Sequence, residues 1–193
     1  IGVRLVGSEM CIRDRGDIVH AMVVLQFIKK FNNEILIDWF VEESYMELLK
    51  LNPDINKVHE VKIQNAKKQK SFALLIREFL KVRKLESYDL VIDMQGLIKS
   101  AIISRLIPSK LTLGFDKFSA RERLASIFYS KTFKYSYEAN VIKRNLALIE
   151  YALSFNIGIK EVQNKVPFLY SSKQAQTIEL SSSKKNILLI PGA

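Results

Sequence analysis

Two polar side chains, Asp93 and Gln95, follow directly after an apolar run that starts at Tyr88. The run predicts a buried strand, Gly96 permits a tight turn, and Leu97–Ile107 has the apolar spacing of an amphipathic helix. In an open α/β sheet such a strand-to-helix junction is where ligands bind. Asp93 and Gln95 therefore either face a ligand crevice or cap the helix that follows.

A second acidic group, Asp17, stands after Gly16 at the start of a predicted helix. A carboxylate at this place can cap the free N–H groups of the helix, or it can act as a general base if a cleft lies beside it. His20 follows one turn later on the same helix. It is a secondary candidate for ligand contact, and the alternative is a structural histidine on a mostly apolar helix.

Cations are concentrated between Lys57 and Lys84, where nine Lys and Arg residues stand against two Glu. Lys67, Lys68 and Lys70 occupy a polar stretch predicted as a loop. They can grip an anionic ligand, or they can form a solvated charge run. Lysines supply positive charge without the bidentate geometry of arginine.

The composition is that of a globular protein with an anionic partner. The 193 residues are 48% hydrophobic, enough for one sizeable core, and the net charge is +10. Nucleic acid, anionic lipid headgroups and phosphorylated glycolipids all fit this charge. No apolar run approaches the roughly 20 residues of a membrane span. Cys11 is the single cysteine, and no metal site is expected from the spacing of His, Cys or acidic residues.

Strand and helix patterns alternate along the chain, which predicts a Rossmann-like, doubly wound, mainly parallel α/β sheet. The expected strands are Ile1–Leu5, Glu34–Val41, Lys57–Ile63, Tyr88–Asp93 and Leu111–Phe115. The expected helices are Asp17–Lys30, Ser44–Leu51, Ser71–Leu85, Leu97–Ile107 and Ala139–Phe155. Ser44 is expected to cap its helix together with Glu47. The third helix is expected to turn one apolar stripe toward the protein core. This stripe consists of Phe72, Leu75, Phe79, Val82 and Leu85.

Four segments carry a family resemblance in addition to these patterns. They are GDIVHAM at 16–22, IDWFVEES at 37–44, DMQGLIKSA at 93–101 and GFDKFSARERLASIFYSK at 114–131. In order and spacing they resemble the lipopolysaccharide heptosyltransferase I family, inverting glycosyltransferases of family nine. The resemblance implies the GT-B architecture, in which two Rossmann-like domains face each other across a cleft.

The resemblance also implies a division of the chain. Residues 1–170 are expected to form the N-terminal acceptor-binding domain, 171–185 a polar, serine-rich linker, and 186–193 the start of a C-terminal donor-binding domain. The chain is thus expected to be a fragment that is inactive alone. Residues 6–15 interrupt the family pattern and are expected to be a non-native insert without function, Cys11 included. The alternative is a loop specific to this lineage.

The chemistry implied by the resemblance is transfer of L-glycero-D-manno-heptose from ADP-heptose to the sugar Kdo of Kdo-lipid A, without metal or other cofactor. Asp17 is the expected general base. The residues expected to bind the acceptor are Lys67, Lys68, Lys70, Gln95, Lys99 and Arg121. The residues expected to contact the donor are Gly16, Pro191 and Gly192. Secondary candidates for the ligand site are His20 and Asp93. Arg123 replaces a proline of the family motif.

The expected location is the cytoplasmic face of the inner membrane, with the protein bound peripherally to its anionic surface and no nucleic acid partner. One alternative is a sibling enzyme of the heptosyltransferase II type, which adds the second heptose. A different alternative is a non-catalytic basic module that binds an anionic membrane or nucleic acid. Its stacking groups would be the interleaved aromatic and basic residues between Phe128 and Tyr137.

Overall fold

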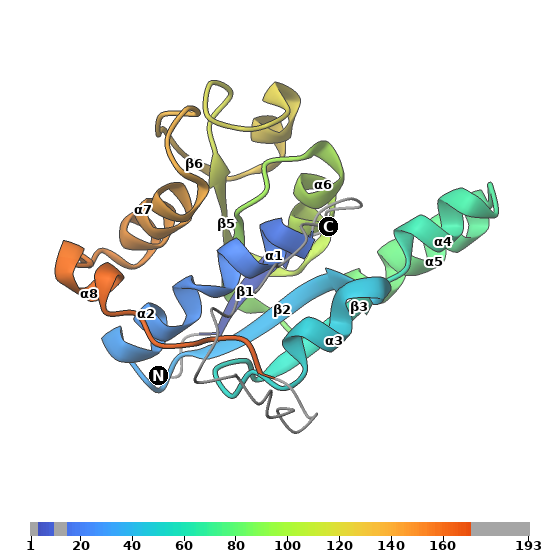
Figure 1. The fold of residues 1–193 in the computed structure, drawn as a ribbon. Coiled ribbons are helices and arrows are strands. Elements are labelled where there is room, and N and C mark those ends of the chain that lie inside the picture. The colour runs from blue at the N-terminus through green and yellow to red at the C-terminus, as the bar shows by residue number, and fades with distance from the viewer. Residues whose placement is uncertain (1–3, 10–14, 171–193) are drawn as a thin grey trace, which may run out of the picture.

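A six-stranded parallel sheet forms the centre of the protein (Figure 1). The computed structural model describes residues 4–9 and 15–170, so the predicted linker 171–185 and the predicted start of the C-terminal domain, 186–193, lie outside the described residues, as does Cys11. The spatial order is β3-β2-β1-β4-β5-β6. The strands are β1 Arg4–Glu9, β2 Leu36–Glu42, β3 Lys57–Val61, β4 Tyr88–Asp93, β5 Ser109–Phe115 and β6 Lys131–Phe133.

The direction of winding reverses once in this sheet. The chain builds outward from β1 through β2 to β3, then crosses back to place β4 on the other side of β1 and continues to β5 and β6. The predicted doubly wound parallel α/β fold is therefore confirmed. At such a reversal the loops after the two central strands diverge and leave a crevice at their carboxyl ends. Here the crevice lies beyond β1 and β4.

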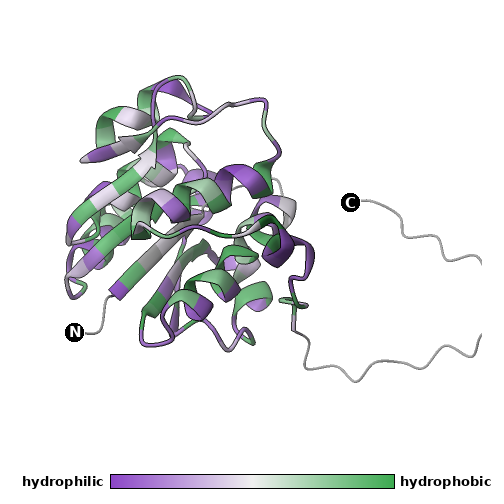
Figure 2. Ribbon diagram, turned by 90° about the vertical axis from the view of Figure 1, so that its left-hand side faces the viewer, coloured by the Kyte–Doolittle hydropathy of each residue, from purple (hydrophilic) through white to green (hydrophobic). Residues whose placement is uncertain are grey.

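Helices cover both faces of the sheet. The α-helices are α1 Arg15–Met22, α2 Val24–Phe31, α3 Met46–Leu49, α4 Ile63–Lys68, α5 Phe72–Arg83, α6 Ile98–Leu106, α7 Val141–Leu153 and α8 Ile159–Gln163. Two short 3-10 helices are η1 Glu43–Tyr45 and η2 Arg123–Phe128. The larger core cluster joins α1, α2 and α7 to the sheet, and the smaller one joins α5 and α6 to it. Figure 2 shows the apolar strands between helices whose hydropathy alternates along their length. Within the described part of the chain, no helix is long and apolar enough to cross a bilayer.

Several predicted boundaries are wrong at the first strand and helix. The strand predicted to end at Leu5 continues to Glu9. Val6–Ser8 pair with both β2 and β4, and Glu9 pairs with β2. The pairing on both sides satisfies the backbone hydrogen bonds of this central strand, which explains why it extends. The helix predicted from Asp17 to Lys30 is divided at Val23 into α1 and α2.

The structure also corrects three predictions about caps, loops and buried residues. Ser44 does not cap a helix, because the chain already turns in η1 and α3 begins only at Met46, without a side-chain cap. The polar stretch predicted as a loop after β3 is the helix α4. Ser71 does cap α5 by accepting a hydrogen bond from the Leu74 N–H, but Phe72, predicted to face the core, is 75% exposed.

Gly114 on β5 allows an aromatic ring to lie directly on the sheet. A Cβ atom at this position would come within 2.4 to 2.7 Å of three ring atoms of Tyr129. Tyr129 is buried, and its hydroxyl donates a 2.7 Å hydrogen bond to Asp93 on the neighbouring strand. No side chain other than hydrogen leaves room for the ring in this place.

We expect Gly114→Ala to lower the free energy of unfolding by roughly 1–3 kcal/mol, because overpacking displaces the Tyr129 ring. Chemical denaturation followed by circular dichroism measures this change. Gly158→Ala is the matched control, since among the described residues its added Cβ meets no atom closer than 3.7 Å. Equal stability of the two variants would contradict the packing argument.

A buried acid, Asp38, joins the amino-terminal parts of β2 and β4. Its carboxylate accepts hydrogen bonds from Tyr88 Oη at 2.6 Å and from Asn56 Nδ2 at 2.7 Å, and it lies 3.1 Å from His59 Nε2. Arg4 adds a guanidinium at 3.7 Å. Burial opposes ionisation of Asp38, but the hydrogen bonds from His59, Tyr88 and Asn56 outweigh it and lower the pKa to about 2.

Asp38 should therefore stabilise the fold in a pH-dependent way. Its folded-state pKa lies below the ordinary value of 3.8, so the stabilisation is present above about pH 4 and is lost as the pH falls toward 2. A shift of this size corresponds to roughly 2 kcal/mol. We expect Asp38→Asn to be less stable than the wild type by about this amount at pH 7 and the difference to shrink between pH 4 and pH 2 in urea titrations. A difference that is constant with pH would refute the assignment, and Asp54→Asn, in a partly exposed turn, is the control.

Candidate active site

The buried carboxylate of Asp93 organises the turn between β4 and α6. Oδ1 accepts hydrogen bonds from the backbone N–H groups of Gln95 at 2.9 Å and Gly96 at 3.3 Å. Oδ2 accepts from the hydroxyls of Ser100 and Tyr129, both at 2.7 Å. Burial raises the pKa of Asp93, and these four bonds act in the opposite direction. Because Asp93 is fully buried, it acts on the crevice by shaping its wall and has no surface to offer a ligand.

Gly96 connects this turn to the segment after β5. Its φ angle of 65° lies in the left-handed region, and an added Cβ would approach Ala120 and the Arg121 nitrogen at 3.2 Å. The Gly96 carbonyl accepts a 2.9 Å hydrogen bond from the Glu122 N–H, and the Glu122 carboxylate accepts a 2.6 Å bond from the Ile98 N–H. These contacts determine where Arg121 lies.

Arg121 forms an ion pair with Asp17 across the crevice. Its Nη1 atom lies 3.1 Å from Oδ2 of Asp17, and the two side chains are 48% and 27% exposed. Asp17 lies in the first turn of α1, after β1, and Arg121 lies after β5. The pair therefore joins residues 104 positions apart at the carboxyl edge of the sheet. Both groups stay accessible to a ligand.

A cavity of about 270 Å³ surrounds this ion pair. It brings together three of the predicted site residues, Asp17, Gln95 and Arg121. The other lining residues are Met94, Tyr137, Ala139, Val141, Arg144 and Asn145. The walls thus come from the segments after β1, β4, β5 and β6.

Arg144 is a cation of this cavity that the sequence analysis did not identify. Its guanidinium lies over the rings of Phe115 and Tyr137, 4.7 and 4.8 Å from their centres. It donates hydrogen bonds to the backbone carbonyls of Tyr137, at 3.0 Å, and Ser119. Burial lowers the pKa of Arg144, although an arginine keeps its charge in proteins. A fixed positive charge thus lies in the wall of the cavity.

Asn145 supplies a polar atom to the same cavity. The side chain is 2% exposed, and its Oδ1 atom has no hydrogen-bond partner among the described residues. An unsatisfied buried carbonyl oxygen is unfavourable unless a ligand donates to it. The sequence signal for this wall was the polar run Lys143, Arg144 and Asn145 near the start of a mostly apolar helix.

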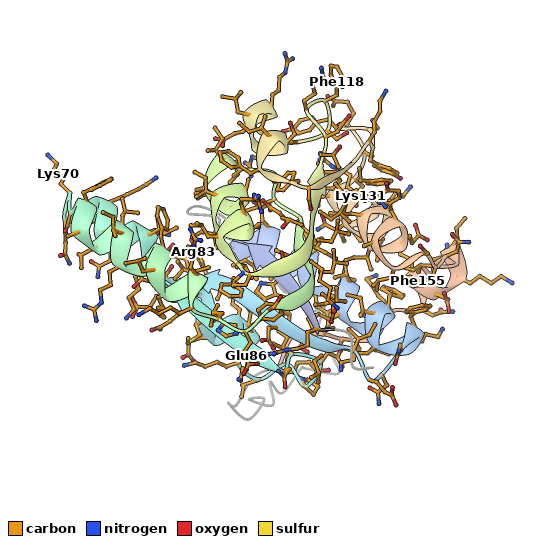
Figure 3. The ribbon with its side chains drawn as sticks, turned by 180° about the vertical axis from the view of Figure 1, so that it is seen from behind. Lys70, Arg83, Glu86, Phe118, Lys131 and Phe155 are labelled. Carbon is orange, nitrogen blue, oxygen red and sulfur yellow. The ribbon has the colours of Figure 1, made fainter. Side chains whose placement is uncertain are left out.

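The predicted lysines lie away from the cavity. Lys67 and Lys68 are exposed on α4, and Lys70 lies at the tip of the α4–α5 hairpin, which projects from the body of the molecule (Figure 3). Lys99 lies in the first turn of α6. Burial raises the pKa of Glu42, and the positive charge of Lys99 acts to lower it. None of these lysines lines the cavity around Asp17.

The remaining predicted residues have varied surroundings. Gly16 is exposed, and no described residue lies within 4 Å of a Cβ added to it. His20 is partly buried, and its Nδ1 atom lacks a hydrogen-bond partner in the described part of the chain. Pro191 and Gly192 lie outside the described residues. In residues 4–9 and 15–170, no group of three or more His, Cys, Asp or Glu side chains has the arrangement of a metal site.

The aromatic residues considered for base stacking mostly contact one another. Phe133 stacks on Tyr135 and Tyr151, with ring centres 5.9 and 4.7 Å apart, and Tyr129 is buried against Gly114. Tyr137 holds Arg144. The segment thus packs as a half-buried edge of the sheet.

Comparisons with known proteins agree with this geometry. Residues 76–193 match the family described as glycosyltransferase family 9 (heptosyltransferase). The lipopolysaccharide heptosyltransferase 1 of Campylobacter coli is 38% identical over 187 residues, which cover 92% of this chain and 52% of the relative. The enzyme of the same name from Pseudomonas aeruginosa is 33% identical over 143 residues, which cover 72% of this chain and 40% of the relative.

A solved structure shows the same fold. The Escherichia coli heptosyltransferase WaaC with ADP-2-deoxy-2-fluoro heptose superimposes with a TM-score of 0.73 at 28% identity, over 80% of this chain and 49% of that chain. The chain thus spans about half the length of the relatives it matches. The sheet order, the crevice at its point of reversal and the sequence match lead to one conclusion: the chain belongs to the heptosyltransferases of glycosyltransferase family 9.

Proposed function

We propose that this chain forms the acceptor-binding part of an enzyme that transfers heptose from ADP-heptose to Kdo of Kdo-lipid A in the synthesis of the lipopolysaccharide inner core. The observation that carries the proposal is the Asp17–Arg121 pair inside the cavity at the point of sheet reversal. A base and a cation side by side suit an acceptor sugar that carries both a nucleophilic hydroxyl and a carboxylate.

In the proposed reaction Asp17 accepts the proton of the acceptor hydroxyl. The hydroxyl oxygen forms a bond to the anomeric carbon of heptose while the bond from that carbon to the phosphate oxygen breaks on the opposite face. The configuration is thereby inverted, and ADP leaves with the electron pair of the broken bond. No metal ion or other cofactor takes part in the proposed step.

The acceptor is held, in this proposal, by the positive and polar groups of the cavity. Arg121 is exposed enough to exchange its contact with Asp17 for the carboxylate of an incoming sugar. Arg144 adds a fixed charge from the wall. Gln95 lies beside them, and Asn145 Oδ1 can accept a hydrogen bond from a sugar hydroxyl.

The surroundings of the cavity belong to the same proposal. The donor binds chiefly to a second domain, with Gly16, Pro191 and Gly192 at its edge. Lys67, Lys68, Lys70 and Lys99 attract the phosphorylated glycolipid at longer range, consistent with the net charge of +10. The enzyme works on the cytoplasmic face of the inner membrane, where such an acceptor is presented by an anionic surface.

The first test replaces the proposed base. In the complete enzyme, Asp17→Asn should lower kcat by at least about a hundredfold, the usual contribution of general-base catalysis. Steady-state kinetics with ADP-heptose and Kdo-lipid A measure the effect. Asp54→Asn makes the same chemical change at a partly exposed turn outside the cavity and should retain full turnover. Normal turnover in Asp17→Asn would leave this carboxylate with a structural role only.

The second test separates acceptor binding from donor binding. Arg121→Gln should raise the KM for the acceptor about tenfold or more and weaken its dependence on salt, because a charge-assisted contact is lost. The KM for ADP-heptose should stay unchanged. Arg123→Gln, an exposed neighbour that does not line the cavity, is the control. An effect confined to the KM for ADP-heptose would contradict the proposed role of Arg121 in binding the acceptor.

A further inference from the structure

Helix α5 presents apolar side chains on two neighbouring faces, which lie about a quarter turn apart around the helix axis at about 100° per residue. Leu75, Phe79 and Val82 pack into the smaller core cluster. On the other face Phe72, Ile76 and Leu80 are 75%, 43% and 53% exposed. Three large apolar side chains exposed together on one helix are unusual for a surface that meets only water.

The exposed apolar residues form one continuous stripe. They follow each other at intervals of four residues, which places them on the same side of the helix. At 1.5 Å per residue the stripe is about 12 Å long. Ala73, also exposed, lies beside the stripe, three residues before Ile76.

Cations border the stripe. Arg77, Lys81, Arg83 and Lys84 are exposed, and none forms an ion pair with a carboxylate in the described part of the chain. The single acid of α5, Glu78, is partly buried and accepts a 3.3 Å hydrogen bond from the Lys62 N–H. The outer face of α5, defined as the stripe with these four cations, thus combines apolar and positive groups only.

The position of the helix makes this face accessible. Helices α4 and α5 form a hairpin that projects from the body of the protein (Figure 1), with Lys70 at its tip (Figure 3). Exposed Lys67 and Lys68 on α4 add further positive charge to the hairpin.

We infer that the outer face of α5 docks the protein on an anionic lipid bilayer, with the stripe in the headgroup region and the cations on the lipid phosphates. A stripe of Phe, Ile and Leu flanked by Lys and Arg is the pattern of an interfacial helix, and charge complementarity selects an anionic membrane as the occupant. The inference deepens the proposed function by assigning its membrane contact to named residues. It does not depend on which sugar is transferred.

The experiment measures sedimentation of the full chain with vesicles, in the absence of donor and acceptor. Vesicles of phosphatidylglycerol and phosphatidylethanolamine are compared with vesicles of phosphatidylcholine alone, at about 0.1 M and about 1 M salt, where the Debye length is about 10 and 3 Å. The apolar variant combines Phe72→Gln, Ile76→Gln and Leu80→Gln. Its matched control combines Ile159→Gln, Val166→Gln and Leu169→Gln, which are 79%, 59% and 51% exposed in the wild type. The charge variant combines Arg77→Gln, Lys81→Gln, Arg83→Gln and Lys84→Gln.

The wild type and the control should bind the anionic vesicles and sediment little with phosphatidylcholine. The apolar variant should lose at least about tenfold in partition coefficient at both salt concentrations, and the charge variant should lose binding at low salt together with its salt dependence. Circular dichroism verifies the helix content, and the charge variant keeps the test valid if the apolar variant is unfolded.

Two results would overturn the inference. One is equal vesicle binding by the wild type and both outer-face variants. The other is a change of oligomeric state in the apolar variant without a change in vesicle binding, which would assign the face to a second copy of the chain. The vesicle experiment contains no substrate, so its result does not test the proposed transfer reaction. Conversely, an inactive enzyme that still binds vesicles through α5 would contradict only the proposed function.

Discussion

The site depends on one buried acid, Asp93. A carboxylate without solvent is tolerated only where donors surround it, and here two backbone N–H groups and two hydroxyls do so. These bonds join the end of β4, the first turn of α6 and the Tyr129 ring beside Gly114. They also set the Gly96 turn, whose carbonyl holds the Glu122 N–H and thereby places Arg121. An interior group thus determines where Arg121 of the candidate site lies.

The two ends of the sheet use buried acids differently. At the amino ends of β2 and β4, Asp38 is enclosed by Tyr88, His59 and Asn56, and this network contributes to stability. At the carboxyl ends, Asp93 shapes a wall while Asp17 stays partly exposed beside Arg121. Because all strands are parallel, every loop that can carry chemistry emerges at the same edge. The Asp38 network and the candidate site therefore lie at opposite ends of the strands.

Helix α5 shows a similar separation across a single element. Its inner face, with Phe79 and Val82, completes the core beneath β4, and its outer face is apolar and positive. The sequence periodicity alone assigned Phe72 to the core stripe, because it lies at the expected helical spacing. A helix with two apolar faces has no unique orientation in the sequence. Only packing against the sheet decides which face is buried.

The alternation of strands and helices, the doubly wound class and the limits of β4 could be predicted from the sequence, because they follow from local patterns. A motif pointed to Asp17, Gln95 and Arg121, which the structure brings together in one cavity. The tertiary structure added what local patterns do not encode. It extended β1 through pairing on both sides, formed α4 where a loop was expected, and brought Arg144 and Asn145 from α7 into the cavity. It also placed Lys67, Lys68 and Lys70 on the hairpin, away from Asp17. The physical reason is that the distances between residues far apart in sequence depend on how helices pack on the sheet, and that packing is a property of the whole core.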